Sequence, residues 1–311
     1  MRKRRTPIVA VAALASIVCG GAQAGQPEKR VEGAQAPSHV EIEAGYAEVP
    51  GGRLFYEVTG SGDTLVLIHG NIGDRRHWDH QFEALAQKLR VVRYDVRGFG
   101  RSSLPEEGKP YTDHEDLAAI LDHLDISRAH IAGWSMGSGI AVDFVLGHPE
   151  RAASLIPIGP WVSRYSSPAA QSMYADMDAV RAALAEGGAT AAVDAWMEAP
   201  FFATTIRDAS AGSEFRNIAG DYSWWSWSHT NPRRFLEPRA TRRIGEIRVP
   251  TLILTAEHDV PACLEIADLL DQTVADSRKV VMVGTGHLLH MEKPEGFNQH
   301  LLDFVSALGG E

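Results

Sequence analysis

The sequence predicts an α/β fold, in which a mostly parallel β-sheet carries helices on both faces and a helical cap is inserted into the order of strands. Three observations lead to this fold class. Short apolar runs typical of buried strands alternate with helical patterns, this alternation breaks between about Pro160 and Thr241, and it then resumes. Strands and helices that alternate form parallel sheets. The chain has 311 residues, 44% of them hydrophobic, enough for one large domain with an insertion.

The N-terminal stretch has the features of a secretory signal peptide. Basic residues at Arg2–Arg5 precede an apolar run at Ile8–Val18, and Ala22–Ala24 forms a small-residue cleavage site. We therefore expect residues 1–24 to be removed on export to the periplasm or out of the cell. The apolar run is too short to span a bilayer comfortably, so no stable membrane anchor is expected. Residues 25–44 are polar and predict a flexible lead-in.

Charge and cysteine content exclude several function classes. The net charge is −10, and removal of residues 1–24 takes away four basic residues and no acidic one, which makes it −14. Such a charge argues against nucleic acid and anionic membrane surfaces as partners. The partner that the motifs below predict is a small-molecule substrate. Since Cys19 lies in the predicted signal peptide, Cys263 is the one cysteine left, which excludes an intramolecular disulfide and a cysteine-based zinc site. The sequence predicts no particular oligomeric state.

The elements of the sheet follow in order from the apolar runs. A hairpin at Pro50–Gly52 joins the first two strands, and helices are expected after most of the later strands. The predicted strands are Ala44–Val49, Leu54–Thr59, Thr64–Ile68, Val91–Asp95, His130–Trp134, Ala153–Ile158, Thr251–Thr255 and Lys279–Val283. The predicted helices are His77–Leu89, Thr112–Leu124, Met136–Gly147, Leu264–Leu270 and Pro294–Leu308.

The interruption separates a core from a cap. The segments 45–160 and 241–311 make up the predicted core, and 161–240 the predicted cap insertion. The cap lacks strand runs and has helical stretches at Ala169–Glu186 and Ala189–Glu198. We expect it to lie over the carboxyl ends of the strands.

A G-x-S-x-G motif at Gly133–Gly137 makes Ser135 the candidate nucleophile. It lies between a predicted strand and a predicted helix, the context in which this turn exposes a serine hydroxyl. The alternative is a glycine-rich turn with an incidental serine. The first oxyanion donor is expected to be the backbone N–H of Met136, and the second that of Asn71 in the His69–Gly73 loop, with Ile72 as the second choice.

A serine hydroxyl needs a base, and an imidazole base needs an orienting carboxylate. His287 follows the last strand in a glycine-containing loop, whereas its competitor His290 lies nearer the final helix. Asp259 lies farther into the loop after strand Thr251–Thr255 than the alternative Glu257. The chain order Ser135, Asp259, His287 is the order expected for a strand–turn–helix serine site on a parallel sheet of this type.

Three other histidines are assigned no role in the chemistry. His77 and His80 are spaced like residues on one helix face, which predicts a solvated face, and His130 is predicted to be a buried strand residue. No metal or organic cofactor is implied.

These motifs together resemble the α/β-hydrolase superfamily, and within it the cap-bearing esterases, lactonases and related enzymes. Besides GWSMG, the resemblance depends on HGN at His69–Asn71, DVRGFGRSS from Asp95, PTLILTAEHD from Pro250 and GHLLHMEKPEGFN from Gly286. It covers about residues 45–160 and 241–308, and it implies that Asp95, Arg97 and Gly98 brace loops near the site.

The resemblance also separates this sequence from related groups. The HGN triplet and the cap are similar to those of haloalkane dehalogenases and epoxide hydrolases, but their nucleophile is an aspartate, where this chain has Ser135. The HGGPG loop of proline iminopeptidases is absent, as is the Gly-Pro-Gly loop of ring-cleavage carbon–carbon hydrolases.

The expected function is cleavage of a small to medium carboxylic ester or lactone. The alternatives are another acyl chemistry on the same residues, as in an acyltransferase or a cofactor-free perhydrolase, or a non-catalytic binding module. Four tryptophans are candidates for contact with the substrate, although each could equally pack the cap onto the core: Trp161, Trp224, Trp225 and Trp227.

Overall fold

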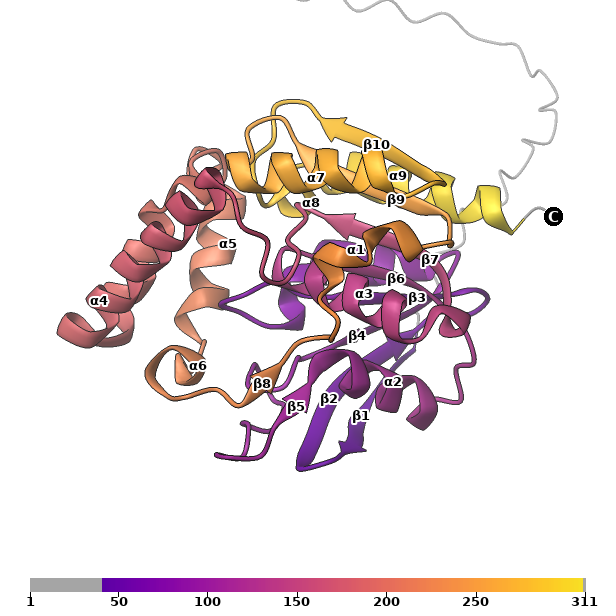
Figure 1. Ribbon diagram of the computed structural model, residues 1–311, viewed down its shortest axis with the longest axis horizontal. Coiled ribbons are helices and arrows are strands. Elements are labelled where there is room, and N and C mark those ends of the chain that lie inside the picture. The colour runs from indigo at the N-terminus through magenta and orange to yellow at the C-terminus, as the bar shows by residue number, and fades with distance from the viewer. Residues whose placement is uncertain (1–40, 310–311) are drawn as a thin grey trace, which may run out of the picture. The chain divides into compact units, whose positions relative to one another are not determined.

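An eight-stranded β-sheet forms the centre of the computed structural model, which describes residues 41–309 (Figure 1). The predicted signal peptide, and the predicted lead-in up to residue 40, lie outside the described residues. The strand order is β1-β2-β4-β3-β6-β7-β9-β10, in which β1–β2 and β2–β4 are antiparallel and all other neighbours are parallel. The strands are β1 (Ile42–Val49), β2 (Gly52–Thr59), β3 (Thr64–Ile68), β4 (Arg90–Tyr94), β6 (Ala129–Trp134), β7 (Ala152–Ile158), β9 (Thr251–Ala256) and β10 (Ser277–Met282).

The inner strands are buried on both faces. Every residue of β6 and β9 is buried, as are all but one residue of β3 and β7. This explains their continuous apolar sequences, because helices cover both faces of a parallel sheet. The edge strand β10 has a single buried residue, Met282.

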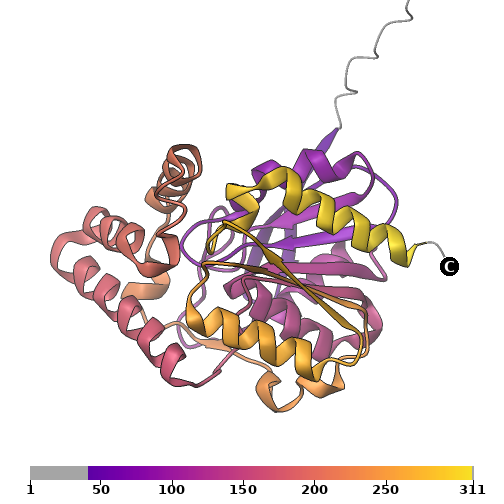
Figure 2. The same cartoon turned by 90° about the horizontal axis from the view of Figure 1, so that it is seen from above.

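Helices cover the two faces of the sheet separately. Figure 2 shows α9 on one face and α3 and α7 on the other. Contacts between α1 and α9, and between α2 and α3, complete the two layers. The core helices are α1 (Asp79–Ala86), α2 (Asp113–His123), α3 (Met136–Gly147), α7 (Pro261–Thr273), the short α8 (Leu289–Glu292) and α9 (Pro294–Leu308).

The inserted segment forms helices beside the sheet (Figure 1). Its elements are α4 (Pro168–Glu198), the 3₁₀ turn η3 (Pro200–Phe202), α5 (Ala209–Gly220), α6 (Trp225–Ser228) and the two-residue strand β8 (Arg233–Arg234). Helix α4 is interrupted at Gly188, whose φ of 71° is outside the helical region, so it corresponds to the two predicted helices. The expectation of a cap without strands is wrong in one place, because β8 pairs in parallel with β5 (Tyr111–Thr112).

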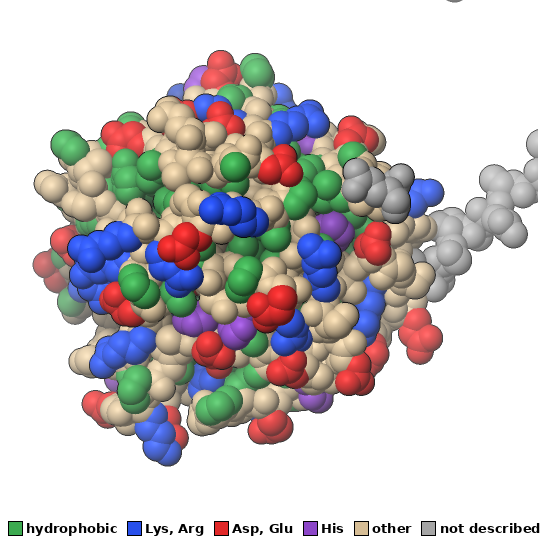
Figure 3. All heavy atoms as spheres, turned by 45° about the vertical axis from the view of Figure 1, so that its right-hand side comes forward, with side chains coloured by type: hydrophobic (Ala, Val, Ile, Leu, Met, Phe, Trp, Pro, Cys, Tyr) green, Lys and Arg blue, Asp and Glu red, His purple; other side chains and the backbone are tan. Residues whose placement is uncertain are grey.

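Surface charge and helix hydrophobicity indicate whether nucleic acid or a membrane could be a partner. On the face in Figure 3, Lys and Arg side chains are interspersed with Asp and Glu side chains, and no continuous basic surface is visible. Among the helices between residues 41 and 309, none is long and apolar enough to cross a membrane.

Candidate active site

The candidate nucleophile lies in a tight turn between β6 and α3. Ser135 has φ 53° and ψ −116°, a backbone conformation that is strained for a residue with a side chain. Glycines on both sides permit this turn. A Cβ atom on Gly133 would lie 2.1 Å from the carbonyl oxygen of Gly137, and one on Gly137 would lie 2.3 Å from that of Ile68. The motif therefore brings a strand, a turn and a helix into backbone contact.

The structure brings Ser135, His287 and Asp259 into one hydrogen-bonded row. The Nε2 atom of His287 lies 2.9 Å from Oγ of Ser135, and Nδ1 lies 2.8 Å from Oδ1 of Asp259. His287 and Asp259 are both buried. An ionised carboxylate can only accept, so Nδ1 carries the proton and Nε2 is left to accept from the serine hydroxyl. The backbone N–H of Val260 donates to the same Oδ1 at 2.8 Å, which fixes the orientation of the Asp259 side chain.

The competing residues lie elsewhere. Glu257 is on the surface, where its carboxylate accepts a hydrogen bond of 2.7 Å from the backbone N–H of Gly284. His290 is fully buried behind the site, with its ring centroid 4.6 Å from that of Trp78. Burial lowers the pKa of His290 well below its usual value, so it stays neutral.

Both expected oxyanion residues lie at the pocket. Asn71 and Met136 line it together with Ser135. Met136 is the first residue of α3, where a backbone N–H has no partner within the helix. The N–H of Ile72, the second choice, donates instead to the side-chain oxygen of Asn71 at 3.0 Å, and its side chain is fully buried. Ile72 is therefore the weaker candidate, and Asn71 and Met136 remain the expected pair of donors.

His287 is held in position by two residues that the sequence analysis did not identify. The indole N–H of Trp134 donates to the backbone carbonyl of His287 at 2.7 Å, which ties the nucleophile turn to the histidine loop. Gly159 has φ 46°, and a Cβ atom there would lie 3.1 Å from Nδ1 of His287 and 3.3 Å from Oδ2 of Asp259. The position of Gly159 directly after strand β7 was the one available indication in the sequence.

Substitution of Gly159 with alanine should therefore disturb the His287–Asp259 pair. A left-handed φ and two tight contacts act together, and displacement of an imidazole by about 1 Å can lower kcat roughly 100-fold. The matched control is Gly296→Ala in α9, where a Cβ atom meets nothing within 4 Å. Steady-state kinetics that show equal activity for both variants would contradict this role of Gly159.

Glu292 links the histidine loop to the cap. Its Oε2 accepts a hydrogen bond of 2.8 Å from the backbone N–H of Gly286, the residue before His287. Its Oε1 accepts from the hydroxyl groups of Thr204, at 3.3 Å, and of Thr205, both in the inserted segment. The carboxylate of Glu292 therefore connects the loop that carries His287 to the cap.

The residues that were expected to brace nearby loops do so. The carboxylate of Asp95 accepts from the backbone N–H groups of Arg75 at 2.9 Å and Arg101 at 2.8 Å. Arg97 forms a two-pronged, buried ion pair with Asp116. Gly98 has φ 89°, which favours glycine at that turn.

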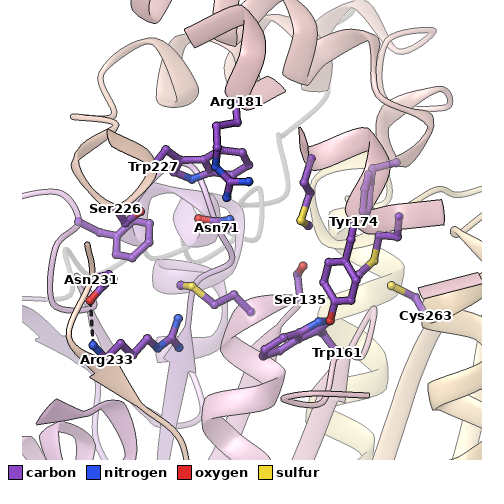
Figure 4. A pocket seen from close by; sticks show the side chains of 15 residues that line it. Asn71, Ser135, Trp161, Tyr174, Arg181, Ser226, Trp227, Asn231, Arg233 and Cys263 are labelled. Carbon is purple, nitrogen blue, oxygen red and sulfur yellow. Dashed lines mark hydrogen bonds between the residues drawn. The ribbon is translucent and has the colours of Figure 1, made fainter. Parts of the chain in front are cut away.

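Core and cap together enclose a pocket of about 250 Å³ over Ser135 (Figure 4). Trp161 and Trp227 line it, as expected of candidate substrate contacts. Trp224 and Trp225 are not among the lining residues. The side chain of Trp224 is 2% exposed and packs in the cap core, and Trp225 stacks on His229 with ring centroids 5.1 Å apart. One turn of helix α6 thus directs neighbouring tryptophans to different surroundings.

This difference gives a matched pair of substitutions. Trp227→Ala should change the ranking of kcat/KM between short and bulky esters, because it enlarges the pocket. Trp224→Ala should instead lower the free energy of unfolding by roughly 3–5 kcal/mol and leave the ranking unchanged. Thermal melts beside a chain-length series of esters test both. Loss of stability in both variants with an unchanged ranking would show that Trp227 is structural too.

His77 is a correction to the sequence analysis, which expected it on a solvated face. It lies in the 3₁₀ turn η1 (Arg75–Trp78) and is fully buried, with ring centroids 5.0 Å from Trp134 and 5.6 Å from Phe215 of the cap. The cap covers the face that would otherwise be solvated. Burial, followed by the neighbouring His69, lowers the pKa of His77 to about 3. His80 is 41% exposed, and His130 is buried in β6 as predicted.

His77 should make the fold acid-sensitive. The unfolded chain protonates this histidine near pH 6.5, whereas the folded chain keeps it neutral down to about pH 3. The free energy of unfolding should therefore fall as the pH drops through this window, by up to about 1.4 kcal/mol per pH unit for this group. His77→Leu should flatten the pH dependence of thermal melts. The control is His258→Gln, which replaces a histidine whose side chain is 56% exposed and should leave that dependence unchanged. Equal slopes for His77→Leu and wild type would refute the assignment.

Cys263 lies beside Asp259 and His287. Ligand atoms of Asp259, Cys263 and His287 lie within 4.8 Å of one another, the one such group among residues 41–309. Burial, and after it the charge of Asp259, raises the pKa of the Cys263 thiol well above its usual value. Metal ions bind the thiolate rather than the thiol, and Asp259 and His287 already pair with each other. The group's chemistry favours proton transfer over metal binding.

Known proteins are similar to this chain over most of its length. A sequence model for the alpha/beta hydrolase fold matches residues 63–294. The chain is 28% identical to "Putative carbamate hydrolase RutD" of Azorhizobium caulinodans over 269 residues, which cover 85% of this chain and 98% of that protein. The solved enol-lactonase of Burkholderia xenovorans LB400 is 25% identical, with a TM-score of 0.72 over 84% of this chain and 100% of that chain.

A second solved structure has a similar fold. The thermophilic esterase of Thermogutta terrifontis, with malate bound, is 25% identical and has a TM-score of 0.73 over 86% of this chain and 99% of that chain. The family match spans well over half of the sequence, and the sheet order, the nucleophile turn and the solved neighbours agree with it. The protein is an enzyme of the alpha/beta hydrolase family.

Proposed function

We propose that the protein is a serine hydrolase that cleaves a small to medium carboxylic ester or lactone through an acyl-enzyme on Ser135. The observation that carries this proposal is the hydrogen-bonded row from Oγ of Ser135 through His287 to Asp259. The enol-lactonase and esterase among the solved neighbours support the choice of substrate class. The cavity of about 250 Å³ favours a small substrate.

The mechanism follows from the atoms in the row. Oγ of Ser135 attacks the carbonyl carbon while its proton passes to Nε2 of His287, and the N–H groups of Asn71 and Met136 stabilise the oxyanion. The tetrahedral intermediate collapses, the leaving alkoxide takes the proton from Nε2, and an acyl ester remains on Oγ. Water then attacks that ester and gives its proton to His287, which returns it to Ser135 as the carboxylic acid leaves. Asp259 holds the imidazole in the required tautomer throughout.

A panel of esters and lactones of increasing size tests this function. We expect hydrolysis of at least one class, with products identified by chromatography. Addition of methanol or hydrogen peroxide as a competing acceptor separates hydrolysis from acyl transfer and perhydrolysis. A product formed almost entirely with the added acceptor would replace the hydrolase proposal with one of these acyl chemistries. Absence of turnover across the panel would contradict the proposed substrate class.

We also propose that the enzyme is exported and acts in the periplasm or outside the cell. The basic start, apolar run and Ala22–Ala24 site of the sequence support this. N-terminal sequencing of protein recovered from the periplasm or medium should begin at Gly25. Recovery of cytoplasmic protein that retains Arg4 would refute it.

A further inference from the structure

The charged and amide side chains that line the pocket over Ser135 gather on one side of it. Figure 4 shows Arg181, Asn71, Asn231 and Arg233 there, together with Ser226 and Trp227, and it shows Tyr174 and Cys263 on the other side of the serine. Two of the polar residues are arginines, and no Asp or Glu lines the pocket among the described residues. The contrast with the whole chain is sharp, because the 40 acidic residues outnumber the 30 basic ones. Within residues 41–309, the pocket lining therefore has two cationic side chains and no acidic one, unlike the chain as a whole.

An ion pair and a backbone hydrogen bond hold Arg233 in place. Its side chain is 16% exposed, and Nε pairs with the buried carboxylate of Asp113. Its backbone N–H donates at 3.1 Å to the side-chain oxygen of Asn231, which also accepts from the hydroxyl of Tyr111 at 3.2 Å. Burial opposes the positive charge, but Asp113 and Tyr111 raise the pKa of the guanidinium above its usual value. Arg233 is therefore a fixed cation.

The remaining donors of Arg233 are available to a ligand. Asp113 occupies Nε, and no described residue accepts a hydrogen bond from Nη1 or Nη2. Figure 4 shows the guanidinium group extending from β8 into the pocket. Two adjacent N–H groups of one guanidinium match the two oxygens of a carboxylate.

Arg181 supplies a second cation from the cap. It reaches down from α4 in Figure 4, with its Cζ 5.4 Å from the ring centroid of Trp227. Its side chain is 57% exposed, and Nη1 pairs with Asp178 on the same helix at 2.6 Å. Since exposed pairs of this kind are weak, Arg181 can turn toward a bound anion, and its contribution should be smaller than that of Arg233.

We propose that Arg233 and Arg181 form a carboxylate subsite, so that the substrate is an ester or lactone that also bears a free carboxylate. This inference rests on the proposed function. It places the reacting carbonyl at Ser135, the carboxylate on the side of Asn71 and Arg233, and any apolar part against Trp161 and Tyr174. The two arginines position the substrate and do not touch the reacting atoms.

The test compares two esters of equal reach and different charge. The probes are 4-nitrophenyl hemiglutarate, which is anionic, and its neutral methyl ester, methyl 4-nitrophenyl glutarate. We expect wild-type kcat/KM to be at least about 10-fold higher for the anionic ester, since a charge-assisted pair contributes roughly this much or more. Arg233→Met should lower kcat/KM for the anionic ester roughly 10- to 100-fold through KM, and change that of the neutral ester little. Arg181→Met should have the same direction and a smaller size.

Controls separate the subsite from stability and from charge in general. Arg216→Met removes a cap arginine that pairs with Asp194 and does not line the pocket, so both esters should keep their kcat/KM. Because Arg233→Met leaves Asp113 unpaired, the double variant Arg233→Met/Asp113→Asn is measured beside it. Wild-type inhibition provides a test without mutation, in which glutarate should compete with substrate more strongly than neutral glutaramide.

The outcomes distinguish this inference from the function on which it rests. Equal kcat/KM for the two esters in wild type, or an equal loss for both in Arg233→Met, would overturn the carboxylate subsite and leave the hydrolase intact. Failure to hydrolyse either ester or any other member of the ester and lactone panel would count against the proposed function itself.

Discussion

Replacement of Ser135 with alanine should lower kcat for ester hydrolysis by on the order of 10⁶-fold. The variant loses the hydroxyl on which the proposed acyl-enzyme forms, while His287 and the proposed oxyanion donors remain. Initial rates with an activated 4-nitrophenyl ester, measured at high enzyme concentration, cover the required range.

Ser135→Ala should fold normally, because alanine replaces serine in the same turn without added volume. An unchanged thermal melt is therefore the control that assigns the loss to chemistry. A variant that retains more than about one hundredth of wild-type kcat would mean that another group carries the reaction.

Asp259→Asn should lower kcat on the order of 10³- to 10⁴-fold. Oδ1 of Asp259 lies 2.8 Å from Nδ1 of His287 and selects the tautomer with the proton on Nδ1. An asparagine amide can donate to Nδ1 instead, which places the proton on Nε2 and removes the acceptor that Ser135 needs. The comparison is kcat at neutral pH for the variant and for wild type.

Glu257→Gln is the matched control for this substitution. Glu257 lies two residues away in the same loop, but its carboxylate contacts the backbone of Gly284 at the surface. Its replacement should change kcat by no more than a few-fold. A crippled Glu257→Gln beside a mild Asp259→Asn would reverse the assignment of the acid.

Much of the core architecture could be predicted because it depends on local patterns. Continuous apolar runs identified the buried strands β3, β6, β7 and β9, and helix α9 begins and ends at the residues expected. The break in α4 at Gly188 was visible as a glycine pair between two helical stretches. For the site, the strand–turn–helix context singled out Ser135, and loops after strands singled out Asp259 and His287. The structure brings these three side chains together.

What could not be predicted depends on contacts between distant segments. His77 is buried because Phe215 of the cap packs on it, and no local pattern contains that contact. Arg233 reaches the pocket from a two-residue strand that exists only through pairing with Tyr111–Thr112. Trp224 and Trp227 occur in the same short WWSW run, and only the packing of α6 decides which of them lines the pocket.

Covalent labelling of the nucleophile tests the central claim most directly. Full-length enzyme is incubated with a small fluorophosphonate, its activity is followed, and the adduct is located by peptide mass spectrometry. We predict one phosphonyl group per chain on Ser135, loss of ester hydrolysis in parallel with labelling, and no adduct in Ser135→Ala. Full activity without an adduct, or inactivation by an adduct on another residue, would contradict the account.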